Sequence, residues 1–174
     1  MKYDIIVAGF GGQGVMIIGK MIAFAAMKEG KNVSWFPSYG PEMRGGTANC
    51  TVVVSDEEVG SPLVLHPDMV IAMNLPSYDR FEKDLKPGGY LVYNSSMGDF
   101  KKRRDDIEYI GLAANDMANE MGNSKVGNII ILGAVSQKLP LKEESYRLAM
   151  EDALHRPELM PLNLKAFKMG REHK

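Results

Sequence analysis

The stretch IIVAGFGGQGVMIIGK, residues 5–20, decides the fold of this chain. It begins as an apolar, β-branched run typical of a buried strand, passes through a glycine-rich turn, and continues as a helical pattern. Glycines at such a turn let the backbone come close to another group. The turn alone does not identify that group. A bound phosphate, a contact with another subunit and a purely structural turn therefore all stay open.

The elements that flank this stretch predict a β-α-β unit. Apolar residues recur through residues 14–28 at the spacing of a helix that covers a sheet, and a second strand is predicted at 33–36. No helix fits between this strand and the next one, at 47–55. Because a parallel crossover needs about a dozen residues or more, we predict a hairpin-like connection and an antiparallel third strand.

The rest of the chain continues the alternation of strands and helices. Further strands are predicted at 68–74, 90–93 and 107–112, and helices at 78–85, 116–121, 126–138, 143–154 and 162–169. The helix at 126–138 is apolar on most sides, so we expect it to be buried. The pattern predicts an α/β fold, namely a three-layer α/β/α Rossmann-like sandwich with a mixed, mostly parallel sheet, in a single domain over residues 1–174.

Composition excludes several classes of protein. The chain has 174 residues, and its net charge of −1 argues against a nucleic-acid binder. It contains no apolar run long enough for a membrane span. Its single cysteine rules out an internal disulfide or a Cys-rich iron–sulfur site and favours the cytoplasm. The thirteen methionines fit either adaptable core packing or a surface that packs against a partner.

The glycine turn matches part of a dinucleotide-binding fingerprint. Gly9, Gly11 and Gly14 have the G-x-G-x-x-G spacing, and such a turn frees backbone N–H groups for a phosphate at a helix N-terminus. The fingerprint also expects an acid at the end of the second strand, to hold a ribose. The sequence there is VSWFPS, residues 33–38. A stand-alone NAD(P)-dependent dehydrogenase is therefore an alternative that lacks this acid.

A second loop, SYGPEMRGG at residues 38–46, follows the second strand. We expect it to lie beside the end of the first strand, where open α/β sheets bind ligands. Tyr39 offers a stacking face, and Glu42 and Arg44 carry opposite charges. The candidate binding residues of this loop are Ser38, Tyr39, Gly40, Glu42, Arg44, Gly45 and Gly46. The alternative is a structural loop closed by a Glu42–Arg44 pair.

Three further features carry weaker signals. Asn94 ends the fifth strand and lines the same edge of the sheet, unless it only terminates the strand. Residues 123–128 either place Lys125 near a ligand or simply begin a helix. The basic run at 101–104 is a solvated loop or a docking site for an acidic partner or phosphate. Cys50 reads as a small buried hydrophobe, and we assign no catalytic residue and no metal ligand.

Together, GFGGQG at residues 9–14 and SYGPEMRGG at 38–46 resemble the gamma subunit of 2-oxoacid:ferredoxin oxidoreductases. The resemblance covers essentially the whole chain, and within the family it favours the 2-oxoglutarate enzyme. It implies a subunit of an enzyme that oxidatively decarboxylates a 2-oxoacid to its acyl-CoA and reduces ferredoxin. The isolated chain is then expected to be inactive.

The resemblance also implies a division of cofactors among subunits. Thiamine diphosphate and the iron–sulfur clusters belong to partner subunits (alpha, beta and delta), while this chain supports assembly and positions coenzyme A. A non-ligand scaffold subunit remains the alternative, and homodimerisation of the isolated chain stays open. By motif and position, the candidate cofactor-binding residues are Gly11, Gly12, Gln13, Gly14, Ser38, Tyr39, Gly40, Glu42, Arg44, Gly45, Gly46 and Asn94.

Overall fold

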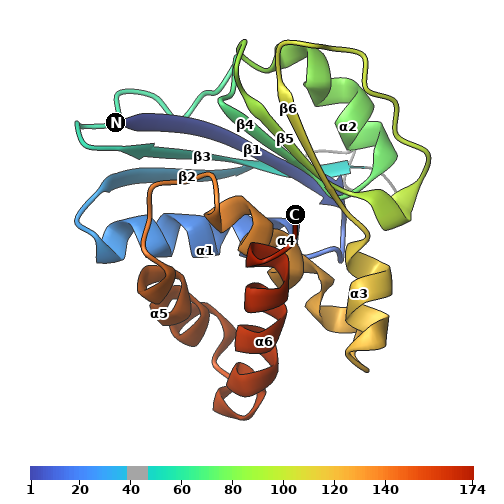
Figure 1. The fold of residues 1–174 in the computed structure, drawn as a ribbon. Helices are drawn as coiled ribbons and strands as arrows, with labels where there is room; N and C mark the ends of the chain where they lie inside the picture. Colours follow the sequence, from blue (N-terminus) through green and yellow to red (C-terminus); the bar gives the residue numbers. More distant parts are fainter. Residues whose placement is uncertain (39–46) are drawn as a thin grey trace.

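The computed structural model describes residues 1–38 and 47–174 (Figure 1). Within them, one sheet has the strand order β2-β3-β1-β4-β5-β6. The strands are β1 Lys2–Phe10, β2 Asn32–Ser38, β3 Thr47–Ser55, β4 Met69–Ala72, β5 Tyr90–Asn94 and β6 Glu108–Leu112. β3 is antiparallel to β1 and β2, whereas β4, β5 and β6 continue parallel to β1. The predicted mixed, mostly parallel sheet and its antiparallel third strand are confirmed.

The helices form layers of unequal thickness on the two faces of the sheet. They are α1 Val15–Lys28, α2 Leu75–Phe81, α3 Ala114–Glu120, α4 Gly127–Ser136, α5 Glu143–Leu154 and α6 Met160–Arg171, with 3₁₀ turns at Glu82–Asp84, Ser95–Met97, Ser124–Val126 and Pro157–Leu159. α1 and α4 lie against one face, α5 packs on α1, and α6 packs on α4 (Figure 1). α2 lies on the opposite face. The predicted α/β/α sandwich is confirmed, with its thicker helical layer on the α1 side.

The hydrophobic core follows from this layering. The larger cluster lies between the sheet and α1 and α4, where Ile5, Ile18 and Ile130 have no exposed surface. A smaller cluster lies under α2 around Tyr78 and Leu91. Because both faces of the central strands are covered, they read in the sequence as continuous apolar runs. Helix α4 is buried almost throughout, as its all-round apolar pattern predicts.

The fourth strand is shorter than the sequence pattern predicts, and α2 begins earlier. Strand β4 ends at Ala72 rather than at residue 74. The reason is a helix cap: the Asn74 side chain accepts a hydrogen bond from the Ser77 N–H at 2.9 Å, and Pro76 occupies the first helical turn. This cap ends the strand and starts α2 three residues before the predicted boundary.

Strand β3 stands between β1 and β2. In the register, Asn49 pairs with Ala8 on one side and with Ser38 on the other. The loop expected beside the end of the first strand falls on residues 39–46, outside the described part of the chain. Thr47, where β3 begins, pairs with Phe10 at the end of β1. Among the described residues, no helix combines the length and the apolar character needed to cross a membrane.

Candidate functional site

A cavity of about 470 Å³ opens at the carboxyl ends of β1, β4 and β5. Parallel strands end at the same edge of a sheet, which is where open α/β folds bind ligands. The residues that line the cavity are Gly12, Gln13, Gly14, Met73, Asn94, Met97, Asn115, Ser124, Lys125, Gly127 and Asn128. The glycine turn, the end of β5 and the start of α4 therefore meet at one place.

The glycine turn is held in position by Gln13. Its side-chain oxygen accepts from the Phe10 N–H at 2.7 Å, and its side-chain nitrogen donates to the Met73 carbonyl at 3.1 Å. Gln13 thus ties the end of β1 to the end of β4. Because both polar groups of its amide are engaged, Gln13 shapes the cavity more than it offers a free donor.

Glycine is favoured at positions 12 and 14 of the turn for different physical reasons. Gly12 and Gly14 both have positive φ angles, +88° and +76°, which other residues rarely adopt. A Cβ at Gly14 would lie 2.4 Å from the side-chain nitrogen of Asn128, whereas one at Gly12 would meet no atom of the described residues within 4 Å. Gly14 therefore packs against α4, while the described residues leave space beside Gly12.

Asn94 is buried and its side chain is occupied. The side-chain oxygen accepts from the backbone N–H of Ser96 at 3.2 Å and of Ala114 at 3.1 Å. The side-chain nitrogen donates to the Asn115 side-chain oxygen at 3.1 Å. Asn94 therefore joins the end of β5 to the start of α3, and through Asn115 it shapes the wall of the cavity.

The cavity favours an anion. Helices α1 and α4 both begin at it, and neither N-terminus has a side-chain cap. One first-turn donor of α4 is occupied, because the Ile129 N–H donates to the Asn128 side-chain oxygen at 3.0 Å. The other first-turn N–H groups, together with the positive ends of the helix dipoles, are available to a negatively charged group. Of the described residues that line the cavity, Lys125 is the cation and none is a carboxylate.

The structure brings together part of the predicted site. Gly12, Gln13, Gly14 and Asn94 line the cavity, and so does Lys125. Gly11 lies in the same turn but outside the lining. Ser38 is exposed and two strands away from β1. The remaining predicted residues, Tyr39, Gly40, Glu42, Arg44, Gly45 and Gly46, lie outside the described part of the chain.

Sequence reasoning missed Asn115, Asn128 and the two methionines of the lining, Met73 and Met97. Asn128 Nδ2 lies near the turn, within reach of a side chain at Gly14. The signal that points to it is the helix start predicted around 126, since a helix that begins at the sheet's ligand-binding edge presents its first residues to the ligand. Asn115 carries a comparable but weaker signal, because it follows the end of β6.

Cys50 is placed away from the cavity. Its side chain has no exposed surface, and burial raises the pKa of the thiol to about 12. Such a thiol is inert as a nucleophile. Within residues 1–38 and 47–174, no group of three or more His, Cys, Asp or Glu side chains is arranged to hold a metal ion.

Comparison with protein families and curated proteins gives consistent matches. A family model described as pyruvate ferredoxin/flavodoxin oxidoreductase matches residues 4–173. The chain is 41% identical to the ketoisovalerate oxidoreductase subunit VorA of Methanothermobacter marburgensis, over 94% of this chain and 35% of that one. It thus spans about a third of that relative. It is 36% identical to the 2-oxoglutarate synthase subunit KorC of the same organism, over 99% and 96% of the two chains.

Solved structures show the same similarity. The gamma subunit of a keto/oxoacid ferredoxin oxidoreductase from Geobacter sulfurreducens superposes with a TM-score of 0.83 at 32% identity, over 98% of this chain and 96% of that one. A 2-oxoglutarate:ferredoxin oxidoreductase from Magnetococcus marinus, solved with 2-oxoglutarate, coenzyme A and succinyl-CoA bound, gives a TM-score of 0.86 at 28% identity. That match covers 98% of this chain and 30% of the other.

Proposed function

The chain belongs to the pyruvate ferredoxin/flavodoxin oxidoreductase family, and on this premise we propose that it is the gamma subunit of a multisubunit 2-oxoacid:ferredoxin oxidoreductase. Such an enzyme converts a 2-oxoacid and coenzyme A to acyl-CoA and carbon dioxide and passes two electrons to ferredoxin. The near end-to-end matches to KorC and to the Geobacter sulfurreducens gamma subunit support this role. We place the complex in the cytoplasm, in keeping with the composition of the chain.

The chemistry of bond breaking and electron transfer belongs to partner subunits in this proposal. An iron–sulfur cluster needs several cysteine thiolates, and the chain has only the buried Cys50. The described lining of the cavity offers no carboxylate for the metal ion that accompanies thiamine diphosphate. The described residues of this chain therefore do not fit either group, and alpha, beta and delta subunits would hold them.

The role of this chain is to hold coenzyme A beside the reacting centre. The observation that carries the proposal is the cavity where the uncapped N-termini of α1 and α4 meet Lys125 without a carboxylate. Coenzyme A carries a pyrophosphate and a ribose phosphate, and both suit such a site. The chain would bind and orient the acyl acceptor, since the described cavity lining includes no His, Cys, Asp or Glu to move a proton.

The geometry disfavours a nicotinamide dehydrogenase. In a dinucleotide-binding fold the second strand lies next to the first, and its terminal acid grips the ribose. Here β3 separates them, and β2 ends at Ser38. Within the described residues, the glycine turn is therefore not accompanied by the acidic side chain that such an enzyme needs.

For the substrate we propose 2-oxoglutarate, and the specific alternative is a branched-chain 2-oxoacid. The match to KorC over the full length of both chains supports the first, and the higher identity to VorA supports the second. The complex purified from its native source should be assayed with 2-oxoglutarate and with 2-ketoisovalerate. A preference of more than tenfold in kcat/KM identifies the substrate.

The coenzyme A role is tested on the same complex with two variants. Lys125→Ala removes the cation at the cavity, and Lys165→Ala removes an exposed cation on α6 as the control. Because Lys125 would contact only the acyl acceptor, we expect the KM for coenzyme A to rise about tenfold while kcat and the KM for the 2-oxoacid change little. An unchanged KM for coenzyme A would contradict this role.

A further inference from the structure

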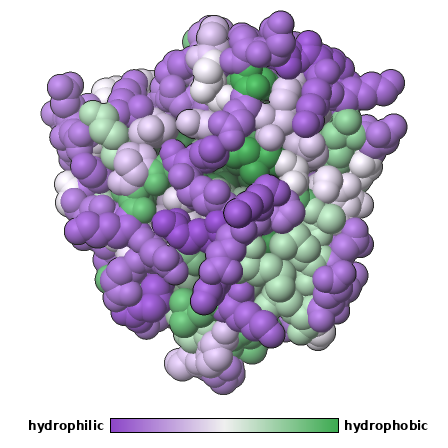
Figure 2. Space-filling model, viewed as in Figure 1, coloured by the Kyte–Doolittle hydropathy of each residue, from purple (hydrophilic) through white to green (hydrophobic). Residues whose placement is uncertain are grey.

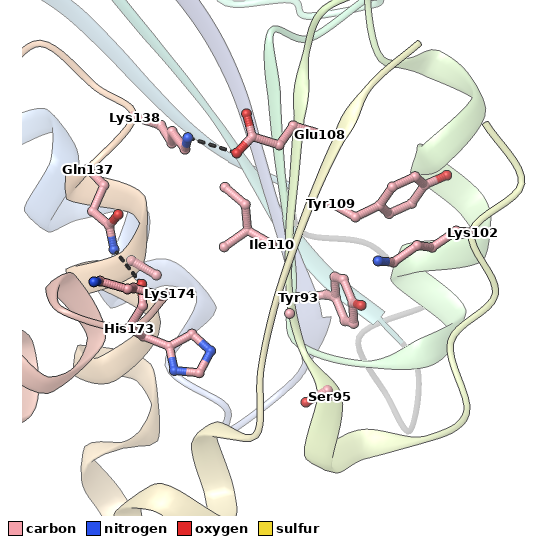
Figure 3. A pocket seen from close by; sticks show the side chains of 12 residues that line it. Tyr93, Ser95, Lys102, Glu108, Tyr109, Ile110, Gln137, Lys138, His173 and Lys174 are labelled. Atoms are coloured by element: carbon pink, nitrogen blue, oxygen red, sulfur yellow. Dashed lines mark hydrogen bonds and ion pairs between the residues drawn. The ribbon is translucent and has the colours of Figure 1, made fainter. Parts of the chain in front are cut away.

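A second and larger groove follows the open edge of the sheet. It has a volume of about 530 Å³ and is lined by Tyr93, Ser95, Lys102, Glu108, Tyr109, Ile110, Gly111, Ala134, Gln137, Lys138, His173 and Lys174. Strand β6 runs through it, and lining side chains lie on both sides of that strand (Figure 3). None of these residues lines the cavity proposed for coenzyme A.

The backbone of β6 has an unpaired side. β6 is the last strand in the sheet order, and among the described residues it pairs with β5 alone. The Glu108 N–H donates toward the β5 side, to the Gly89 carbonyl at 2.9 Å. Because backbone groups alternate in direction along a strand, those of Tyr109 and Gly111 face the open edge. An edge of this kind is a template for another strand.

The two faces of the groove suit the alternating side chains of an added strand. Figure 3 shows Glu108, Ile110, Gln137 and Lys138 on the α4 side of β6. On the opposite side it shows Tyr93, Tyr109 and Lys102. A strand that pairs with β6 sends successive side chains to the two faces in turn, so each face would receive every second residue.

Positive charge predominates around this edge. The one carboxylate in the lining, Glu108, is already paired with Lys138 at 2.7 Å. Lys102 lies over the Tyr109 ring, 5.6 Å from its centroid, and has no ion pair among the described residues. Lys174 is exposed and lines the groove on the other side of β6, near Gln137 (Figure 3). On the face shown in Figure 2, hydrophilic residues predominate, and apolar areas lie near the centre and to the lower right of the view.

We propose that β6 is the docking edge for an extended, acidic segment of a partner subunit, which adds to the sheet as a further strand. This inference rests on the proposed function, because that function supplies the partner subunits. A second copy of this chain is the less suitable occupant, since pairing two β6 edges would bring the lysines of both copies together. An acidic segment would instead neutralise Lys102 and Lys174 while its backbone pairs with Tyr109 and Gly111.

The first test is amide hydrogen exchange, read at Tyr109 and Gly111 in the isolated chain and in the purified complex. The expected result is rapid exchange of both amides in the isolated chain and at least a hundredfold slowing in the complex. Equal exchange in the two samples overturns the proposal, although co-purification of the subunits would still support the proposed function. Slowing that grows with the concentration of the isolated chain alone would assign the edge to a second copy and overturn it too.

The second test changes charge without changing the β6 backbone. The double variant Lys102→Glu/Lys174→Glu reverses two lysines of the groove, and Lys83→Glu/Lys165→Glu makes the same change of charge at exposed positions elsewhere. At low salt we expect the dissociation constant for the partner subunits to rise at least tenfold for the groove variant and less than twofold for the control. Equal effects of the two variants would show that only net charge matters and would refute the proposal. If no complex forms with the wild-type chain, the proposed function fails and this inference fails with it.

Discussion

Gly12 and Gly14 share a left-handed backbone but differ in what surrounds them. An added Cβ at Gly14 would press on Asn128, whereas one at Gly12 would contact none of the described residues. Both positions carry the cost of a positive φ in any other residue, about 1–2 kcal/mol. The two glycines of one turn therefore separate the effect of backbone strain from the effect of packing against α4.

We predict that Gly14→Ala destabilises the chain by at least 1 kcal/mol more than Gly12→Ala does, because Asn128 must move. The same movement should raise the KM for coenzyme A in the complex. Urea denaturation of the isolated chain measures the first effect, and steady-state kinetics of the complex measures the second. Equal losses of stability in the two variants would mean that strain alone explains this turn.

The buried thiol of Cys50 makes stability depend on pH. The folded state holds the thiol proton up to about pH 12, whereas in the unfolded chain it is lost above about pH 8.5. The free energy of unfolding should therefore decrease between these values, by up to about 1.4 kcal/mol per pH unit from this group. Guanidinium denaturation at pH 8, 9 and 10 measures the slope. The variant Cys50→Ala should show a shallower one, and parallel slopes would refute the assignment.

The roles of Gln13 and Asn94 show where prediction from sequence stops at the scale of single residues. Gln13 was predicted from the motif of the glycine turn and Asn94 from its place at the end of a strand, and both line the cavity. What the pattern does not contain is the partner of each amide. Gln13 bonds to a carbonyl 60 residues away, and Asn94 bonds to a helix start 20 residues away. Such partners depend on tertiary packing, so a ligand role and a bracing role cannot be separated from the sequence.

Helices α4 and α6 approach each other through two glycines. A Cβ at Gly133 would lie 2.1 Å from the Phe167 carbonyl oxygen, and one at Gly170 would lie 1.8 Å from the Ile130 carbonyl oxygen. Both obstacles are backbone atoms, which cannot move aside without shifting a whole helix. Small residues at a crossing point let two helix backbones come into direct contact, and here each helix supplies one of them.

We predict that Gly133→Ala destabilises the chain by about 3 kcal/mol, because overpacking at this crossing forces the two helices apart. The matched control is Gly127→Ala in the same helix, where the nearest atom to a new Cβ is 3.5 Å away. That change should stay within about 0.5 kcal/mol of the wild type, given the higher helix propensity of alanine. Thermal denaturation of both variants measures the loss of stability. Comparable losses in the two would show that the crossing tolerates a methyl group.

At the scale of elements, periodicity predicted most strands and helices but not their neighbours. The third strand was correctly expected to be antiparallel, because the connection at residues 39–46 is too short for a crossover. A hairpin can be placed with either strand toward the rest of the sheet, and the local pattern does not choose. The pairing of β3 with β1 is a long-range choice, so the sequence pattern did not specify the neighbour of the first strand.

In the whole molecule, helices cover one face of the sheet, whereas the α2 side also uses a segment without regular secondary structure. On the α2 side, the segment at residues 56–68, which connects β3 to β4, lies against β3. This segment is held by a hydrogen bond from the Thr51 hydroxyl to the Pro62 carbonyl at 2.9 Å, and Val64 packs into the small core. Its neighbours Leu63 and Leu65 point outward and are 74% and 76% exposed. Alternation along an extended chain explains this arrangement.

We predict that Leu63→Ser and Leu65→Ser each change the free energy of unfolding by less than about 0.5 kcal/mol, since neither side chain is buried. Val64→Ser should instead cost about 1–2 kcal/mol, because it removes a packed methyl pair from the core. Denaturant titrations of the three variants test the alternation directly. A loss at Leu63 as large as that at Val64 would show that the segment packs with the opposite face inward.

Helix α4 reaches both hollows of the molecule. Its first residues, Gly127 and Asn128, line the cavity at the glycine turn, and Ala134 and Gln137 at its other end line the groove at β6. The helix is ten residues long, or about 15 Å, and its backbone is in contact with that of α6 along the way. The helix therefore connects the cavity and the groove as one rigid element. A shift or tilt of this helix would change the cavity and the groove together. If binding in the cavity changed the affinity of the groove for a partner segment, that segment would change the affinity of the cavity by the same factor.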